Sequence, residues 1–214
     1  MNTKLRLEAI LDIAQRYNFD AVHSHQVECL AGTIFMELAE LHNLEREDRK
    51  LLEYAAILHD IGNFVSESGH HRHTLMLILT EPLIPFTRDE VKIIANVARY
   101  HRKALPSPEH TLFGALSEPD RRKVCLLGAM LRVADALDHS HQSLVRELTC
   151  EVMEDAVIFN LTVDGKMTSD FQMPVEWDAI QRRGDLFRDV FRKAPRINVQ
   201  QPRLASPQAV FQNA

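Results

Sequence analysis

The sequence predicts a mainly α-helical protein in which a helical bundle is followed by a small α+β appendage, a hairpin plus a helix. Apolar residues recur at helical spacing through most of the first two thirds of the chain. Glycine is scarce, with seven residues in 214, and segments that alternate like β-strands appear only after about residue 143. We therefore expect a helical domain over residues 1–142, an α+β appendage over residues 143–199 and a flexible tail over residues 200–214.

Five segments in the first half of the chain have apolar residues at helical spacing: 4–17, 22–42, 46–62, 71–81 and 87–103. Gly62 is a natural stop for the third of them, and Pro82 closes the fourth. Thr87 is a good N-cap for the fifth, because Glu90 follows three residues later as its capping-box partner.

A loop and one long helix complete the predicted bundle. Residues 103–119 contain three prolines and predict a loop with one helical turn, and residues 119–140 have an apolar stripe that predicts a long helix. The appendage is expected to hold a hairpin of two strands, a helix and a third strand, over residues 148–152, 157–163, 175–192 and 196–199.

The composition of the chain predicts where the protein is located and which kinds of partner it does not bind. The net charge of −5 argues against wholesale nucleic-acid binding, and no specific nucleic acid is expected as a partner. The three cysteines are far apart in the chain, which favours free thiols in a reducing compartment. The first twenty residues do not form a secretory signal, and no segment is long enough to span a membrane. We expect a cytoplasmic protein without a membrane partner.

Eleven histidines are many for this length, and several of them fall between apolar helical segments. His23, His59, Asp60 and Asp135 lie on three different predicted helices, and a bundle can direct such side chains to one central point. Histidine nitrogens with carboxylate oxygens suit a divalent cation, for which we consider Mn, Fe, Zn, Ni and Mg. Adjacent helical residues point about 100° apart, so His59 and Asp60 can share one ion only near the end of their helix.

A structural explanation of the same residues stays open at this point. His-Asp dipeptides are common, and a histidine in a helix is more often at the surface or hydrogen-bonded in the core than bound to a metal. The surroundings favour a metal site, because LLEYAAIL precedes the dipeptide, IG follows it and a later apolar segment ends in VADALD.

These segments resemble a known pattern. His23, then LLEYAAILHDIG, then LRVADALD are similar in order and context to the motifs of HD-domain metal-dependent phosphohydrolases, over residues 20–140. The resemblance implies an HD-domain fold for the helical bundle. It also implies that His23, His59, Asp60 and Asp135 hold a metal, with His59 and Asp60 as the catalytic residues.

A wider resemblance covers about residues 5–198. GHHRHTLMLIL, VARYHRKALP and LRVADALDHS resemble the C-terminal half of exopolyphosphatase/guanosine pentaphosphate phosphatase (Ppx/GppA) proteins, in which an HD-like helical domain precedes a small α+β domain. In that family, polyphosphate hydrolysis belongs to an N-terminal actin-like domain with glycine-rich phosphate loops. This sequence has no such segment, so we expect a free-standing helical module without exopolyphosphatase activity by that mechanism.

The two-metal members of the HD group suggest further ligands. By that resemblance His71, at the start of one helix, and His101, at the end of the next, would bind a second ion that shares Asp60. His73 competes with His71 for this ligand position, and if it is not a ligand it is expected to support one. His70 is expected to be solvent-exposed. We therefore expect one or two divalent ions per chain.

Cationic side chains surround the predicted ligands. Four of them are suited to bind a phosphate group: Arg72, Arg99, Arg102 and Lys103. Cations at a helix end also complement the helix dipole, and this simpler explanation stays open. Arg132 lies one turn before Asp135 and is predicted to orient its carboxylate, and Asp138 lies on the same face as a further supporting residue.

Three functions are compatible with the sequence. The leading one is a cytoplasmic metal-dependent phosphohydrolase, in which metal-activated water attacks a phosphomonoester, a nucleotide or a polyphosphate-like anion. The alternative is a non-catalytic regulatory module that binds polyphosphate or a guanosine alarmone and forms a homodimer, which the family resemblance allows. The third is a structural interaction domain whose histidines are satisfied core residues. The complete set of ligand positions favours the first, since binding alone would not need His59 and Asp60 together with Asp135.

Overall fold

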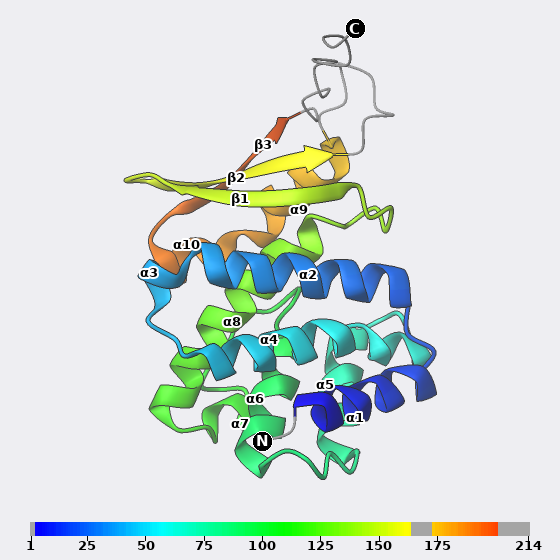
Figure 1. The fold of residues 1–214 in the computed structure, drawn as a ribbon. Coiled ribbons are helices and arrows are strands. Elements are labelled where there is room, and N and C mark those ends of the chain that lie inside the picture. The colour runs from blue at the N-terminus through cyan, green and yellow to red at the C-terminus, as the bar shows by residue number, and fades with distance from the viewer. Residues whose placement is uncertain (1–2, 164–172, 201–214) are drawn as a thin grey trace, which may run out of the picture.

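Residues 3–163 and 173–200 are described by a computed structural model, which has a helical body with a three-stranded sheet at one end (Figure 1). The predicted fold class, mainly helical with a small α+β appendage, is confirmed. Residues 201–214, nearly all of the predicted flexible tail, lie outside the described residues. The domain boundary expected near residue 142 stays a prediction.

The helical body follows the predicted segments closely. Its helices are α1 (Thr3–Arg16), α2 (Ala21–Glu37), α3 (Ala39–His42), α4 (Arg46–Leu58), the 3₁₀ helix η1 (Ile61–Phe64), α5 (His70–Thr80), α6 (Arg88–Arg99), α7 (Thr111–Gly114) and α8 (Glu118–Ala136). The segment predicted as one helix over residues 22–42 is broken at Leu38 into α2 and α3. The predicted capping box is confirmed, because the side chains of Thr87 and Glu90 each accept a hydrogen bond from the backbone N–H of the other.

The appendage holds β1 (Val145–Val152), β2 (Ala156–Val163), α9 (Pro174–Arg183), α10 (Asp185–Phe191) and β3 (Ala194–Gln200). β1 and β2 form the predicted antiparallel hairpin, with Thr149 opposite Asn160. β3 pairs with β2 in parallel, which requires a crossover, and α9 and α10 lie between these two strands in the chain. The single helix predicted over residues 175–192 is divided at Gly184, where an added Cβ would lie 2.5 Å from Pro195 Cγ.

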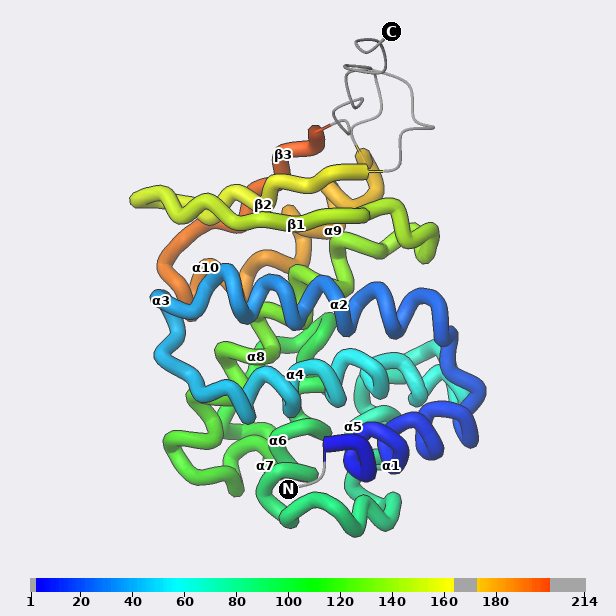
Figure 2. Tube along the Cα trace, viewed as in Figure 1, coloured from blue at the N-terminus to red at the C-terminus, as the bar shows by residue number. Residues whose placement is uncertain are grey.

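The body is built in layers around α8. α2 packs on α4 and α4 packs on α1, so these three helices lie one below another in Figure 2. α8 contacts α2, α4 and α6 in the body and α9 and α10 in the appendage, and its residues from Leu126 to Ala136 are all buried. A helix that is buried all round needs apolar or small residues on every side, and this segment has them except at Arg132 and Asp135.

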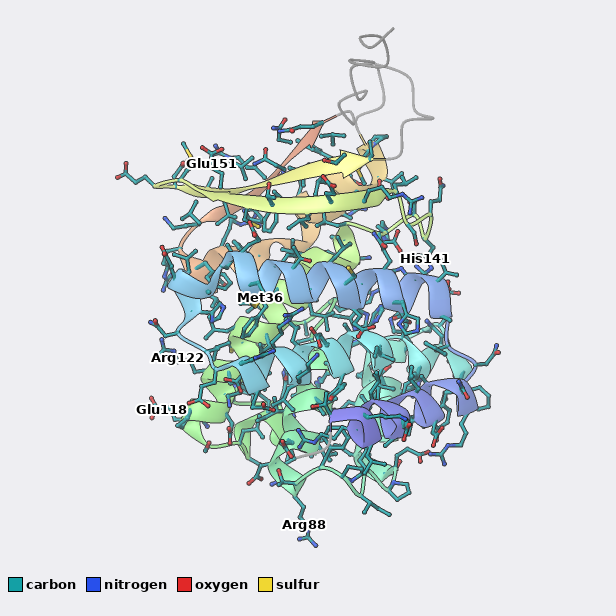
Figure 3. All side chains as sticks on the ribbon, in the orientation of Figure 1. Met36, Arg88, Glu118, Arg122, His141 and Glu151 are labelled. Carbon is teal, nitrogen blue, oxygen red and sulfur yellow. The ribbon has the colours of Figure 1, made fainter. Side chains whose placement is uncertain are left out.

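Charged side chains cover the outside of the body. Arg88, Glu118 and Arg122 project from the body in Figure 3, Glu151 projects from β1 of the appendage, and each is exposed. Among the described residues, no helix is long and apolar enough to cross a membrane. The buried charged residues are therefore the ones that need an explanation, since a buried charge is costly unless it is paired.

The buried charge of Arg6 fixes α1 to the rest of the helical body. Arg6 is 4% exposed, its Nε donates to the Pro85 carbonyl at 3.1 Å, and its guanidinium carbon lies 4.5 Å from the centre of the Phe86 ring. Its Nη2 also pairs with Glu90. Burial alone would raise the pKa of Glu90, but the hydrogen bonds with Arg6 and Thr87 and the charge of Arg6 together outweigh burial and hold this pKa below its ordinary value.

We expect Arg6→Met to lower the free energy of unfolding by roughly 2–3 kcal/mol, because the Pro85 carbonyl and one carboxylate oxygen of Glu90 lose their partner in a partly buried place. Arg16→Met is the matched control. Arg16 lies in the same helix and pairs with Glu81 at 2.8 Å, but its side chain is 55% exposed. The Glu81 side chain is only 10% exposed, but it keeps the hydrogen bond from the Tyr17 hydroxyl when Arg16 is replaced. A pair formed by an exposed guanidinium contributes about 0–1 kcal/mol.

The contribution of Arg6 should also depend on pH. Because the pKa of Glu90 is depressed in the folded protein, its stabilisation is present above the ordinary value of 4.5 and is lost as the pH falls through the folded value. Urea unfolding of the three proteins near neutral pH and near about pH 3 measures both effects. Equal stability of Arg6→Met and Arg16→Met near neutral pH would contradict this explanation.

Candidate metal centre

Four buried histidines from different elements meet in the interior: His23 in α2, His59 just after α4, His70 at the start of α5 and His101 just after α6. Two of them are oriented by the carbonyls of their own helices. His59 Nδ1–H donates to the carbonyl of Ala56 and His101 Nδ1–H donates to that of Ala98, each at 2.6 Å. Since a carbonyl only accepts, the proton lies on Nδ1 and the lone pair of Nε2 is left free.

The other two histidines follow the same pattern. His70 Nδ1–H donates to the Glu67 carbonyl at 3.1 Å, and His23 Nδ1–H donates to the carboxylate of Asp138 at 2.8 Å. A hydrogen bond to one ring nitrogen fixes the tautomer and the orientation of the ring, which is the usual arrangement behind a metal-binding histidine. Asp138 therefore supports His23 directly.

The free nitrogens of His70 and His101 face Asp60, and we call these three residues the His70 group. The two Nε2 atoms are 3.1 Å apart, and Asp60 Oδ1 lies 3.1 Å from His70 Nε2 and 3.4 Å from His101 Nε2. Three lone pairs thus point into one small space. Without a cation between them these atoms would repel one another, so the arrangement calls for a proton or a metal ion.

A second set of ligand atoms adjoins the first at Asp60, and we call His23, His59 and Asp135 the His23 group. His23 Nε2 lies 3.5 Å from Asp135 Oδ1, and His59 Nε2 lies 3.8 Å from the same oxygen. His59 Nε2 also lies 3.7 Å from Asp60 Oδ1. Neither Nε2 has a hydrogen-bond partner in the described part of the chain, although both are buried. A buried nitrogen without a partner is costly, and an ion held by this group would satisfy both.

The turn after α4 brings the two groups together. α4 ends before His59, and the chain turns through Asp60 into η1, so both residues stand at the end of the helix as predicted. Thr74 in α5 holds this turn, since its hydroxyl donates to the His59 carbonyl at 2.9 Å and accepts from the Gly62 N–H at 3.0 Å. The first turn of α5, which carries His70, is thereby fixed against the turn that carries Asp60.

The charges of the site follow from burial and proximity. Burial opposes the charged form of Asp60, but His59 and the other neighbouring histidines outweigh it, and the pKa of Asp60 lies well below its ordinary value. Burial, reinforced by His59, lowers the pKa of His101 to about 3, so His101 is neutral and able to bind a metal. Burial also disfavours the charged form of His23, yet its two carboxylate neighbours raise its pKa to about 9. A bound metal ion would replace that proton.

Arg183 from the appendage completes the site. Its Nη1 pairs with the Asp135 carboxylate, and its Nη2 lies 3.0 Å from Nδ1 of His139. Burial alone would raise the pKa of Asp135, but Arg183 and the adjacent histidines hold it below its ordinary value. The sequence did not single out Arg183, because it lies 48 residues after Asp135 in a helix with no motif of its own.

The structure places Arg132 differently from the prediction. Its buried guanidinium does not bind Asp135 but donates to the carbonyls of Tyr100 and Arg183, at 3.1 and 3.0 Å, and pairs with Asp185 at 2.8 Å. Carbonyls at helix ends lack partners within their helix, and a long guanidinium can reach those of α6 and α9 at once. Arg132 therefore binds the backbone carbonyl of Arg183, the residue whose side chain pairs with Asp135.

The prediction that His70 is solvent-exposed is wrong, and His70 takes the place expected for His71. His70 is 3% exposed and contacts Asp60, whereas neither His71 nor His73 joins a group of close ligand atoms among the described residues. The physical reason is the start of α5, which begins at His70 after Gly69 with a φ of 78°. Neighbouring helical residues point about 100° apart, so a shift of one residue changes which histidine faces the site. The predicted ligands that the structure does bring together are His23, His59, Asp60, His101 and Asp135.

Cations gather beside the His70 group. A cavity of about 310 Å³ is lined by residues 67–71 together with Arg102 and Lys103. Burial and the surrounding positive charges lower the pKa of His71 to about 4. Those charges include three of the residues predicted to bind phosphate: Arg72, Arg102 and Arg99. The cavity therefore lies in a positive field, although Arg99 itself is also placed over the Tyr100 ring, 5.2 Å from its centre.

Comparison with known proteins finds a matching family model and several relatives that carry the same name. The family model "Ppx/GppA phosphatase, domain III" matches residues 5–178, which is most of the chain. The chain is 28% identical over 164 residues to the guanosine-5'-triphosphate,3'-diphosphate pyrophosphatase of Vibrio parahaemolyticus serotype O3:K6, and 30% identical over 165 residues to that of Vibrio vulnificus. Each match covers 76% of this chain and 32% of the relative, so the chain spans about a third of the length of the curated relatives it matches. The match over residues 5–178 shows that the chain belongs to the family of Ppx/GppA phosphatase domain III.

Proposed function

We propose that this chain is a metal-dependent phosphohydrolase of the HD type that acts on a phosphomonoester, a nucleotide or a polyphosphate-like anion. One observation carries the proposal: the ligand atoms of His70, His101 and Asp60 lie within 3.4 Å of one another, each with a lone pair facing the others. Ligand atoms that bind one metal ion at about 2.1 Å are themselves about 3.0–3.4 Å apart. The spacing of these three atoms is therefore that of ligands sharing an ion.

Two ions per chain fit the two groups of ligand atoms. The His23 group would hold the first ion and the His70 group the second. Asp60 would contribute to both, because its Oδ1 lies 3.7 Å from His59 Nε2 and 3.1 Å from His70 Nε2. Imidazole-rich sites favour Mn, Fe, Zn or Ni over Mg, which prefers oxygen ligands.

The residues around the ligands have separate tasks in such a reaction. A bound divalent ion lowers the pKa of a coordinated water and neutralises charge on a phosphoryl group. Arg102 and Lys103 line the cavity next to His70 and would bind phosphoryl oxygens there. Arg183 binds one oxygen of Asp135 and leaves the other facing the histidines. The Nδ1 hydrogen bonds keep the buried imidazoles oriented, so little reorganisation is needed during the reaction.

The comparisons support a phosphatase function without naming the substrate of this chain. The relatives are named as pyrophosphatases of guanosine-5'-triphosphate,3'-diphosphate, which is a phosphorylated nucleotide. The chain spans only about a third of these relatives, and this favours a second candidate, a module that binds a phosphorylated ligand without chemistry. Turnover of a phosphoester by the metal-loaded chain separates the two functions.

The proposal predicts different metal contents for two neighbouring variants. His70→Ala should lose about one of two bound Mn²⁺ ions, because His70 belongs to only one group of ligand atoms. His71→Ala is the matched control, since His71 is the next residue in the same helical turn and should leave both ions in place. Elemental analysis after Mn²⁺ loading and gel filtration measures the content, with circular dichroism as a check of the fold. Equal metal content in the two variants would contradict the assignment of His70.

A further inference from the structure

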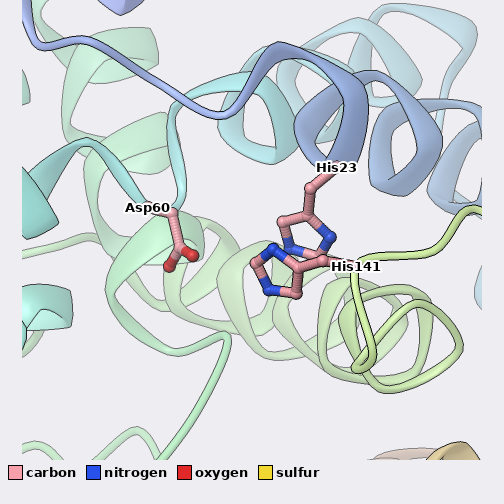
Figure 4. Close-up of side chains that lie close together, drawn as sticks. All are labelled: His23, Asp60 and His141. Carbon is pink, nitrogen blue, oxygen red and sulfur yellow. The ribbon is translucent and has the colours of Figure 1, made fainter.

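We infer that His141 is a further metal ligand, brought to the His23 group by the loop that follows α8; this inference rests on the proposed metal centre. One ring nitrogen of His141, one of His23 and one carboxylate oxygen of Asp60 all lie within 4.8 Å of one another. Figure 4 shows the His141 ring lying on the His23 ring, with its nitrogen atoms on the side where Asp60 lies. The three side chains come from α2, from the turn after α4 and from the loop after α8.

The two stacked rings connect the interior with the surface. Their centres are 3.6 Å apart and their planes differ by 9°, so they are in face-to-face contact. His23 is fully buried, whereas the His141 side chain is 44% exposed. His141 therefore lies on the solvent side of the His23 group, where a ligand would close the site.

A carboxylate orients His141 in the same way as another orients His23. His141 Nδ1–H donates to Asp20 at 3.1 Å, which leaves Nε2 as the nitrogen with a free lone pair. A carboxylate behind a histidine is the common partner of a metal-bound imidazole, because it fixes the ring and raises its basicity. Asp20 is also the N-cap of α2, and its second oxygen accepts from the His23 N–H at 3.2 Å. The Asp20 carboxylate thus binds the His141 ring and the backbone N–H of His23.

The loop holds His141 in an uncommon backbone conformation. Its φ is 56°, in the left-handed region that residues other than glycine rarely adopt. The His141 N–H donates to the Asp138 carbonyl at 2.9 Å, and the Ser143 N–H donates to the Asp138 carboxylate at 2.7 Å. Asp138, which orients His23, therefore also fixes the loop that carries His141. Strain of this kind persists where the surroundings over-determine it, and it is common at ligand sites.

Mn²⁺ titrations followed by the EPR signal of the free ion test this inference. We expect His141→Asn to weaken one of the Mn²⁺ sites by at least about 10–100-fold, because that is the loss found when only the partner behind a metal ligand is removed. Asparagine suits this position because it tolerates a left-handed φ. Asp20→Ser keeps a capping side chain on α2 but removes the carboxylate, so it should weaken the same site by about tenfold. His25→Asn is the control, since His25 is an exposed histidine of α2 that pairs with Glu28.

The outcomes separate this inference from the proposed function. Weaker binding in His141→Asn and Asp20→Ser, with unchanged circular dichroism and with His25→Asn like the wild type, would support it. Unchanged Mn²⁺ affinity in His141→Asn would overturn it, and the proposed metal centre would stand, since the wild type still binds. Absence of Mn²⁺ binding by the wild-type protein would overturn both.

Discussion

Asp60→Ala is expected to abolish metal binding and phosphoester hydrolysis together, while most of the helical content remains. Asp60 Oδ1 lies within 3.7 Å of the Nε2 atoms of three histidines, so its loss removes the ligand that is proposed to serve both ions. The rate should fall by at least about 10²–10³-fold, the usual effect of removing one group that stabilises charge in the transition state. The Asp60 side chain is 17% exposed and small, so alanine leaves no large cavity in its place.

Hydrolysis of p-nitrophenyl phosphate by Mn²⁺-loaded protein, with metal content measured on the same samples, tests this prediction. Asp89→Ala is the control, because Asp89 is an exposed aspartate in the first turn of α6 that pairs with Lys92 at 2.8 Å. It should keep the wild-type rate and metal content. Hydrolysis by Asp60→Ala at the wild-type rate would show that the reaction takes place at another site.

Gly62→Ala is expected to lower the stability of the protein strongly, although it adds only one methyl group. The sequence pointed to Gly62 as the stop of a helix, but α4 already ends at Leu58 and Gly62 lies within η1. Gly62 lets η1 pack closely against α5. An added Cβ would lie 2.1 Å from the His70 carbonyl oxygen and 2.6 Å from the Thr74 backbone nitrogen. Both atoms belong to the backbone, so α5 would have to move. We expect a cost of about 3 kcal/mol or more, at the upper end for overpacked sites.

Gly128→Ala is the matched control for this substitution. Gly128 is also buried, but an added Cβ would lie 3.6 Å from Leu186 Cδ2 and 3.8 Å from Tyr100 Cβ, which are ordinary contact distances. In a helix interior alanine is favoured over glycine by about 1 kcal/mol, so this variant should be as stable as the wild type or more stable. Thermal unfolding should therefore show Gly62→Ala lower by roughly 6–12 °C and Gly128→Ala unchanged or higher.

The Gly62 variant also connects stability with the site. Moving α5 away from the turn after α4 would displace His70 from Asp60, so Mn²⁺ affinity should fall along with the unfolding temperature. Wild-type stability of Gly62→Ala would mean that the close packing of η1 on α5 does not hold the two groups of ligand atoms together.

The positions of most helices were predictable because they depend on local features of the sequence, namely apolar spacing and capping residues. Apolar spacing located most of the body, and the capping box of Thr87 with Glu90 marked the start of α6. The breaks at Leu38 and Gly184 were not predictable from periodicity, since the apolar pattern continues across both. Gly184 divides the last helical segment because Pro195, in β3, packs against it, and that contact depends on the tertiary fold.

The site was predictable where its residues belong to ordered motifs and unpredictable where contacts come from distant segments. That His23, His59, Asp60 and Asp135 come together was expected from the resemblance to the HD-domain motifs. The choice of His70 over His71 depends on the first residue of α5, and sequence patterns locate a helix start only within a few residues. Arg183, His141 and the contacts of Arg132 depend on how the appendage and the loop after α8 pack on the body.

The claim that these histidines and carboxylates form a metal centre is tested most directly by elemental analysis of the purified, tag-free protein. One or two equivalents of Mn, Fe, Zn or Ni per chain are expected, with two after loading, because the ligand atoms form two groups that adjoin at Asp60. Absence of metal, even after Mn or Fe is added under reducing conditions, would contradict the claim. The four buried histidines would then have to be explained as a metal-free part of the core or of an anion-binding site.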